Sequence, residues 1–173
     1  YIVDSQFNVA MRSDVIVWMT EAADNAARHE VARLPGVIAV EPFRGAAARI
    51  RFGHRSRQIG VQGMPADTQH SRVIDANYRE IVLPPEGLVV SIKLAEVLDA
   101  KVGDDLTVEF LEGRRPLRVV PLVGVSEDLT GIAAHMELRA LNRLLGDGDV
   151  MNGASLTIDM AHRREFLHAL KQI

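Results

Sequence analysis

The chain has 173 residues, of which 47% are hydrophobic and 25% are charged. This length fits one domain or two small subdomains, and the apolar content is too high for a disordered chain. A net charge of −3 gives no electrostatic basis for nucleic-acid binding, which calls for a basic surface. The absence of cysteine excludes a disulfide framework and a thiolate metal site.

The first fifty residues are typical of a strand, a helix and a second strand. The apolar run "DVIVWM" (14–19) is rich in strand-forming residues. Over 20–34, apolar residues recur at helical spacing, which predicts an amphipathic helix. The pair Pro35 and Gly36 ends this helix, and residues 37–43 predict the next strand.

The middle of the chain predicts a hairpin followed by a helix–turn–strand unit. Apolar residues alternate with arginines over 46–52, "GHRS" (53–56) makes the turn, and the chain returns to residue 63. In the next unit, Ser91 is expected to cap a short helix, a turn follows at Gly103, and 105–110 alternates as a half-buried strand.

Residues 116–125 complete a second hairpin with that strand. The prolines at 116 and 121 predict an edge position for this segment, because each removes a hydrogen-bond donor from a ladder. A helix is predicted over 136–146, with Gly146 as its C-terminal residue. A strand at 154–160 and a helix over 162–173 end the chain.

The two chain ends resemble each other, since each contains a strand followed by an amphipathic helix. We therefore expect an α+β fold in which both ends, residues 1–45 and 126–173, form one split βαβ layer. Residues 46–125 form a β-rich subdomain inserted between them.

No catalytic motif is visible. Asp147 and Asp149 resemble the start of an EF-hand loop, but Met151 and Ile158 stand where further calcium ligands are required. The segment is better explained as a helix end followed by a polar turn. The histidines and serines show no metalloprotease or nucleophile-elbow spacing. The histidines are His29, His54, His70, His135, His162 and His168, and the serines are Ser5, Ser13, Ser56, Ser71, Ser91, Ser126 and Ser155.

Arginines gather on both predicted hairpins. The first group is Arg44, Arg49, Arg51, Arg55 and Arg57, and the second is Arg114, Arg115 and Arg118. Strand alternation places them on the polar face and at the tips, where a solvated surface is the ordinary explanation. A surface for an anionic headgroup or a partner is the sharper alternative, because the guanidinium fork fits phosphate and carboxylate.

Four stretches together resemble the large extracytoplasmic domain of ABC-transporter permeases of the FtsX/MacB type, which include the LolC and LolE permeases. They are "RSDVIVWM" (12–19), residues 34–63 from "LPGVIAV", residues 83–125 from "LPPEGLVV" and residues 131–159 from "GIAAHMEL". The likeness extends over residues 12–173 and depends on the ordered series rather than on one motif.

This resemblance implies a porter-like, ferredoxin-like layer made by both chain ends, with an inserted β-rich subdomain. It also implies transmembrane helices before Tyr1 and after Ile173 in a bacterial inner-membrane protein. Such permeases pair with a cytoplasmic ATPase and with a second permease copy or homologue, and act on periplasmic proteins or lipids. The domain is then expected to be non-catalytic, without cofactor or metal, and no partner-binding residue is carried over.

Two other classes of function stay open. A soluble periplasmic module that binds a small molecule or peptide predicts a concave apolar pocket with a few polar groups. An enzyme with scattered site residues predicts a carboxylate or histidine of strongly perturbed pKa in a cleft.

Overall fold

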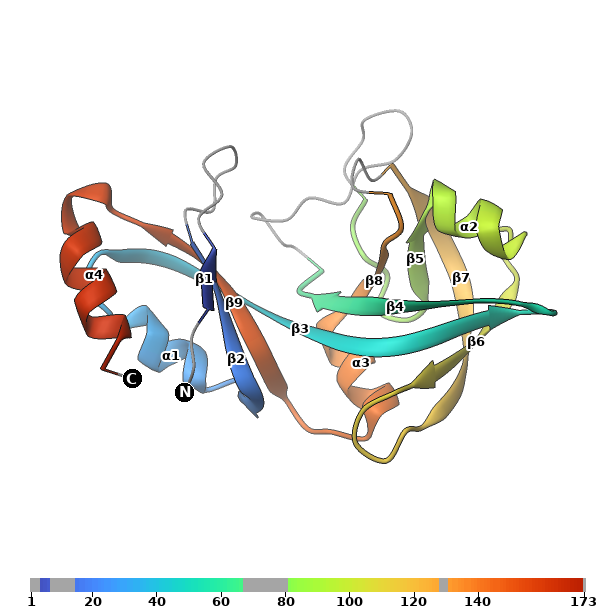
Figure 1. The fold of residues 1–173 in the computed structure, drawn as a ribbon, viewed down its shortest axis with the longest axis horizontal. Helices are drawn as coiled ribbons and strands as arrows, with labels where there is room; N and C mark the ends of the chain where they lie inside the picture. The colour runs from blue at the N-terminus through green and yellow to red at the C-terminus, as the bar shows by residue number, and fades with distance from the viewer. Residues whose placement is uncertain (1–3, 7–14, 67–80, 128–130, 173) are drawn as a thin grey trace. The chain divides into compact units, whose positions relative to one another are not determined.

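The computed structural model describes residues 4–6, 15–66, 81–127 and 131–172 (Figure 1). The chain divides into two compact units. The first unit comprises residues 1–44 and 149–173, and the second unit comprises residues 45–148. Strand β3 (Val37–Phe52) gives its first half to the first unit and its second half to the second unit.

The first unit is a sheet with helices on one face. Its strands lie in the order β1-β2-β9-β3, and β9 pairs antiparallel with both β2 and β3. Apolar side chains of β2 and β9 form a core with α1 and α4, to which Val31, Phe166 and Leu170 contribute. The other elements of this unit are β1 (Asp4–Gln6), β2 (Val15–Asp24), α1 (Ala27–Ala32), β9 (Val150–Ile158), a 3-10 helix η1 (Met160–His162) and α4 (Arg163–Leu170).

The predicted helix over 20–34 is wrong in its first part. Strand β2 continues to Asp24, and α1 begins only at Ala27. Ala23 and Asp24 pair with β9 after a register shift in β2. This long-range pairing overrides the helical spacing of the alanines, because intrinsic helix propensity is a weak influence beside tertiary contacts.

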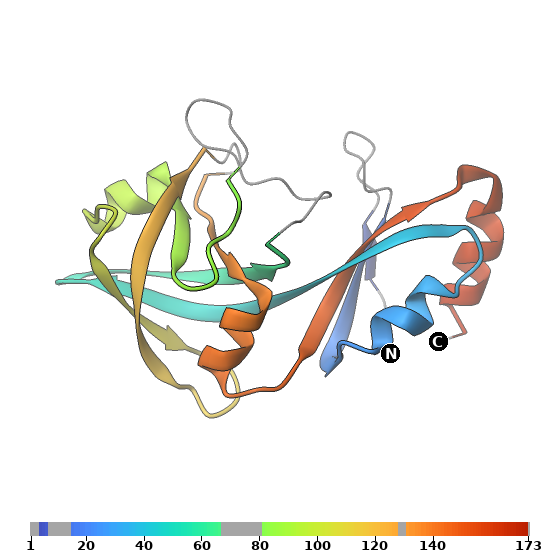
Figure 2. The same ribbon diagram turned by 180° about the vertical axis from the view of Figure 1, so that it is seen from behind.

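The second unit is a closed barrel of six strands (Figure 2). The strands follow the order β3-β4-β8-β5-β7-β6, and antiparallel pairing of β6 with β3 closes the ring. Inward-facing residues such as Ile50, Leu106 and Phe110 fill the interior. The elements of this unit beside β3 are β4 (Arg55–Met64), β5 (Leu88–Ser91), α2 (Ile92–Leu98), β6 (Asp105–Phe110), β7 (Leu117–Ser126), β8 (Ala134–Glu137) and α3 (Leu138–Leu145).

The unit that runs from β5 to β6 agrees with its sequence prediction. The Leu94 N–H donates to Ser91 Oγ at 3.3 Å, so Ser91 caps α2. Gly103 has a φ of +100°, and the side chain of Asp104 accepts a bond from the Lys101 N–H at 2.8 Å. Residues of β6 alternate between the core and the surface, as the period of two predicts.

The predicted edge position of β7 is wrong, because β7 pairs with β6 on one side and β5 on the other. The Leu122 N–H donates to the Asp104 carbonyl at 2.8 Å, on the β6 side. Successive N–H groups of a strand point toward opposite neighbouring strands, so the nitrogen of Pro121 faces β5. The pairing of β5 with β7 starts only at Leu88, which lies opposite Leu122. Pro121 therefore removes no ladder bond, and Pro116 precedes the strand.

The helix predicted over 136–146 is shorter in the structure. Residues 134–137 form β8, so α3 begins at Leu138, and Gly146 ends it with a φ of +72° as predicted. Leu138 and Leu141 are buried. Strand β9 begins at Val150 rather than at 154, and α4 buries Phe166 and Leu170 as expected.

The mixed α+β class is confirmed. The closed six-strand barrel is a different arrangement from the split βαβ layer that was predicted, because β6 returns to pair with β3. The division into compact units also differs from the predicted limit at residue 125. Residues 126–148 lie within the barrel unit, where β8 pairs with β4 and β5 and α3 packs against β4.

Candidate functional site: an arginine hollow on the β3–β4 hairpin

The hairpin of β3 and β4 presents several arginines at the surface of the barrel unit. Along β3, Ala48 and Ile50 point into the core, so Arg49 and Arg51 between them point outward. The loop is Gly53-His54 alone, two residues shorter than the predicted "GHRS", because Arg55 and Ser56 already belong to β4. Gly53 has a φ of +60°, as the first central residue of a type II′ hairpin turn requires.

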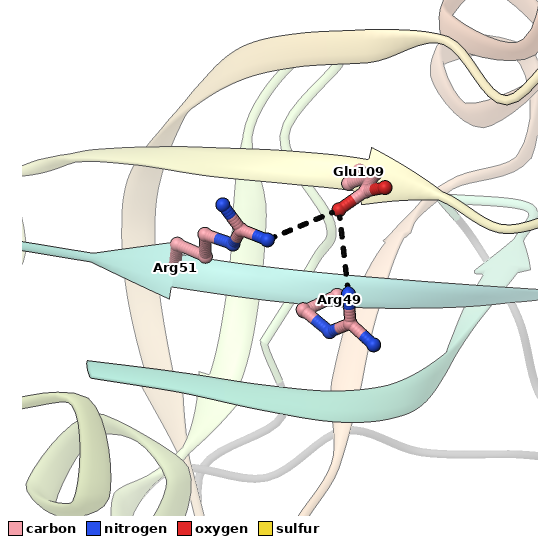
Figure 3. A network of polar contacts seen from close by, with 3 residues as sticks. All are labelled: Arg49, Arg51 and Glu109. Carbon is pink, nitrogen blue, oxygen red and sulfur yellow. Dashed lines mark hydrogen bonds and ion pairs between the residues drawn. The ribbon is translucent and has the colours of Figure 1, made fainter. Parts of the chain in front are cut away.

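Glu109 of β6 joins the two arginines of β3 (Figure 3). It stands directly opposite Arg49 in the β3–β6 register. Its Oε2 atom lies 3.6 Å from Arg49 Nη1 and 3.4 Å from Arg51 Nη2. The side chains of Arg49, Arg51 and Glu109 are 37%, 49% and 27% exposed, so these ion pairs contribute only about 0–1 kcal/mol to stability.

A hollow of about 440 Å³ lies against this hairpin. We call it the arginine hollow, and its lining is Arg49, Arg51, Gly53, His54, Arg55 and Ser56. Three of these side chains are guanidinium groups, and this lining includes neither a carboxylate nor an apolar side chain. The chemistry of such a surface favours an oxyanion, since guanidinium, imidazole and hydroxyl groups all offer hydrogen-bond donors.

The remaining arginines differ in their surroundings. Arg44 was predicted on the polar face, but it is buried with only 5% exposure. It has the same strand parity as Ala46 and Ala48, so alternation turns it inward. Arg57 is exposed on β4 beyond the hollow. Arg114 and Arg115 are exposed at the β6–β7 turn, and Arg118 Nε donates to the Leu144 carbonyl at 3.1 Å.

The structure gives the other sequence candidates local roles. Both carboxylate oxygens of Asp149 accept bonds from Asn25 Nδ2, at 3.1 and 3.3 Å, which ties the start of α1 to the start of β9. Among the residues described, no three histidines or acids lie together as a metal site would need. His70, Ser13 and Ser71 lie outside the described ranges, as does the side chain of Ser5.

Ser91, Ser126 and Ser155 are buried in the scaffold. Ser91 caps α2, while Ser126 lies opposite it in the β5–β7 pairing and Ser155 lies on β9. Ser56 is exposed and lines the arginine hollow.

The carboxyl group of Asp159 has a pKa below its ordinary value, but it is not in a cleft. The main cause is the Ala161 N–H, which donates to Asp159 Oδ1 at 3.0 Å, and the second is the His162 ring, 3.3 Å from Oδ2. The Ala161 contact caps η1, and both contacts lie at an exposed position. This pKa shift therefore has a structural cause and gives no support to an enzyme.

A second hollow in the described part of the barrel unit is small. It measures about 170 Å³. Its lining comes from β7, β8, α3 and the residues just before β5, and it includes Val120, Met136 and Leu144. Pockets for small molecules usually measure ~300–1,000 Å³. Its size therefore does not favour the hypothesis of a small-molecule module.

Glu109 is the member of this site that sequence reasoning missed. Its outward position is readable from the alternation of β6, with Leu106, Val108 and Phe110 buried. Its place beside Arg51, 58 residues away in the chain, depends on the β3–β6 register. Nothing local in the sequence fixes such a register.

Comparison with solved structures identifies the class of fold. The matching structures described here are the extracellular domain of an ABC-type transporter, the periplasmic region of MacB and a domain of a permease, which confirms the resemblance predicted from the sequence. Within the described ranges, the longest helices are too short and too polar to cross a membrane.

The particular structures align over most of the chain at low identity. The extracellular domain of the noncanonic ABC-type transporter YknZ from Gram-positive bacteria has a TM-score of 0.56 and 15% identity, covering 87% of this chain and 86% of its own. The periplasmic region of MacB from Actinobacillus actinomycetemcomitans has a TM-score of 0.57 and 12% identity, covering 88% and 75%.

A third match is a domain of a protein described as a permease from Porphyromonas gingivalis. It has a TM-score of 0.51 and 13% identity, covering 96% of this chain and 86% of its own. At such identities the likeness establishes the fold. Neither the family models nor the curated proteins compared with the sequence give a match.

Proposed function

We propose that this chain is a non-catalytic extracytoplasmic domain of an FtsX/MacB-type ABC transporter permease. In this role it binds a partner or cargo and transmits ATP-driven motion from the membrane complex. The observation that carries the proposal is the common fold, which extends over 87% and 88% of this chain in the YknZ and MacB domains.

The strand order of the first unit supports the porter-like part of this proposal. Because β2 and β3 both run antiparallel to β9, they run parallel to each other, with β9 between them and α1 connecting them. This is the connection expected of a split βαβ layer. The barrel unit is then the insertion, with limits at residues 45 and 148 in place of 46 and 125.

The proposal includes partners of three kinds. A cytoplasmic ATPase supplies the energy through the membrane part of the permease, and a second permease copy or homologue completes the membrane complex. The third partner is a periplasmic protein or lipid cargo. The parent protein belongs in a bacterial inner membrane, with this domain on its periplasmic side.

The first test is to read the natural gene for about a hundred residues on either side of the chain. We expect an apolar run of ~20 residues before Tyr1 and further such runs after Ile173, because ~20 apolar residues span a bilayer as a helix. A signal peptide shortly upstream together with a stop codon soon after Ile173 would contradict the proposal. That result would favour a free secreted binding module.

A further inference from the structure

We propose that the arginine hollow binds a phosphate group, held by Arg49, Arg51 and Arg55, with Glu109 as the carboxylate that competes with it for the first two. The phosphate belongs either to a free anion or to the headgroup of a phospholipid. This inference goes beyond the proposed function, because the chemistry of the hollow does not depend on a membrane parent.

The first support is the sign of the local charge. Three guanidinium groups line the hollow, and Glu109 is the acid that contacts two of them. Arg49, Arg51 and Glu109 together carry one net positive charge, and Arg55 adds a second. The whole chain carries −3, so this hairpin is positive against an acidic background.

The second support is the geometry of the guanidinium groups. Glu109 uses a single oxygen, Oε2, for both arginines, and each arginine uses a single terminal nitrogen in return. A guanidinium carries five N–H donors, so these one-point contacts leave most of its hydrogen-bonding capacity unused by Glu109. On the other strand, Arg55 Nη1 makes a long contact of 3.5 Å with the Val97 carbonyl.

The third support is the composition of the lining, which selects among anions. The lining has no apolar side chain, so it offers nothing to an acyl chain and is suited to a headgroup alone. A phosphate has several acceptor oxygens and more charge than a carboxylate, so it can accept bonds from several arginines together. His54 and Ser56 lie at the same hollow as further donors.

The test uses inorganic phosphate and the ¹⁵N-labelled chain, with sodium chloride holding the ionic strength constant. We expect saturable NMR shifts at the Gly53 and Ser56 amides and at the Nε–H groups of Arg49 and Arg51. The double variant Arg49→Gln/Arg51→Gln should weaken phosphate binding about tenfold or more, since it removes two charge-assisted contacts. Its thermal unfolding should stay close to that of the parent, because the lost ion pairs are exposed.

The matched control is Lys93→Gln/Arg139→Gln, which removes two exposed charges from α2 and α3. It should change phosphate affinity by less than about twofold, because those charges are outside the hollow and are screened by salt. Equal losses in both double variants would overturn the proposal in favour of general charge attraction. Shifts that chloride reproduces, or no saturable shift, would also overturn it.

Glu109→Gln tests whether the Glu109 carboxylate competes with the anion for Arg49 and Arg51. The substitution removes a carboxylate close to the bound anion while keeping a similar shape. We expect phosphate affinity to rise roughly two- to fivefold, as loss of one nearby like charge in a mostly solvated site predicts. A loss of phosphate binding in a folded Glu109→Gln variant would overturn the placement of the anion beside Glu109.

Vesicles identify the source of the phosphate. If the source is a lipid headgroup, the chain should sediment with vesicles of phosphatidylglycerol in phosphatidylcholine more than with vesicles of phosphatidylcholine alone. The Arg49→Gln/Arg51→Gln variant should lose this difference. Binding of free phosphate without vesicle binding supports a soluble phosphate source. Binding of polyglutamate at these arginines without any binding of phosphate would overturn the proposal and indicate an acidic protein partner.

Discussion

Gly153 shows how a single residue sets the outer face of the first unit. Trp18, Gly153 and Phe43 lie in one row across β2, β9 and β3. Because Gly153 has no side chain, the rings of Trp18 and Phe43 meet above it, edge to face, with centroids 4.7 Å apart. A Cβ atom at this position would collide with the Phe43 ring.

We therefore expect Gly153→Ala to lower the free energy of unfolding by about 1–3 kcal/mol, as overpacking usually does. Gly60→Ala is the matched control, since Gly60 also lies in a strand and a Cβ there meets nothing within 4 Å. Urea titration measures both variants. The cost of Gly153→Ala should shrink in a Phe43→Ala background, and an unchanged cost would contradict the ring contact.

Asp159 makes stability depend on pH. Its pKa is lower in the folded chain, chiefly because the Ala161 N–H donates to the carboxylate. The stabilisation is therefore complete above the ordinary pKa of aspartate and is lost as the pH falls through the folded-state value. Asp159→Ala should lower the melting temperature at pH 7.

The difference between Asp159→Ala and the parent should disappear in acid, below about pH 4 and toward the folded-state pKa. Asp159→Asn is the control, since its side-chain oxygen still caps η1 without titrating. Thermal melts at several pH values measure the effect. A gap that stays constant down to low pH would show that the charge of Asp159 has no part in the cap.

At the scale of elements, Ser91 attaches the start of α2 to the barrel. Ser91 Oγ accepts from the Leu94 N–H at 3.3 Å and from the Ala133 N–H at 3.0 Å, so it connects α2 with the segment before β8. At the start of α3, the Glu137 side chain accepts a hydrogen bond from the Ala140 N–H at 2.9 Å.

Ser91→Ala should cost about 2–3 kcal/mol of stability, because it leaves two donors at a buried position without their acceptor. Glu137→Ala should cost about 1 kcal/mol, as loss of one cap usually does. Chemical denaturation of both variants checks this order. Equal costs would mean that the bond to the Ala133 N–H contributes nothing.

Leu98 tests whether α2 is scaffold or binding surface. It is 0% exposed in the barrel core, so Leu98→Ala should cost about 2–5 kcal/mol. Val102→Ala is the control, because Val102 is exposed. Binding of phosphate to the folded fraction should be unchanged in the Leu98→Ala variant. Lost binding in a chain that stays folded would contradict the scaffold role.

The sequence predicted the elements whose signals are local. The Ser91 cap, the Gly103 turn and the alternation of β6 all depend on neighbouring residues, and all three are found in the structure. The extension of β2 to Asp24 and the interior position of β7 depend on partners far away in the chain. The arginines of the candidate site were visible in the sequence, but their contact with Glu109 required the β3–β6 register.

At the scale of the whole molecule, the described residues form two hydrophobic cores, one in each compact unit. The core of the first unit lies between one sheet face and two helices, and the core of the second lies inside the barrel. Packed, separate cores suit a domain that transmits motion, since close-packed interiors have low compressibility. Extracytoplasmic location is the central requirement of the proposed function.

Cysteine labelling in cells tests that location directly. The chain has no cysteine of its own, so Glu96→Cys, on the exposed face of α2, introduces a thiol without background from this domain. The experiment uses the natural full-length protein with any other cysteine replaced, and Leu98→Cys serves as the buried control. We expect a membrane-impermeant maleimide to label Glu96→Cys in cells whose inner membrane is intact, and to spare Leu98→Cys. Labelling of Glu96→Cys only after that membrane is broken would place the domain in the cytoplasm and contradict the proposed function.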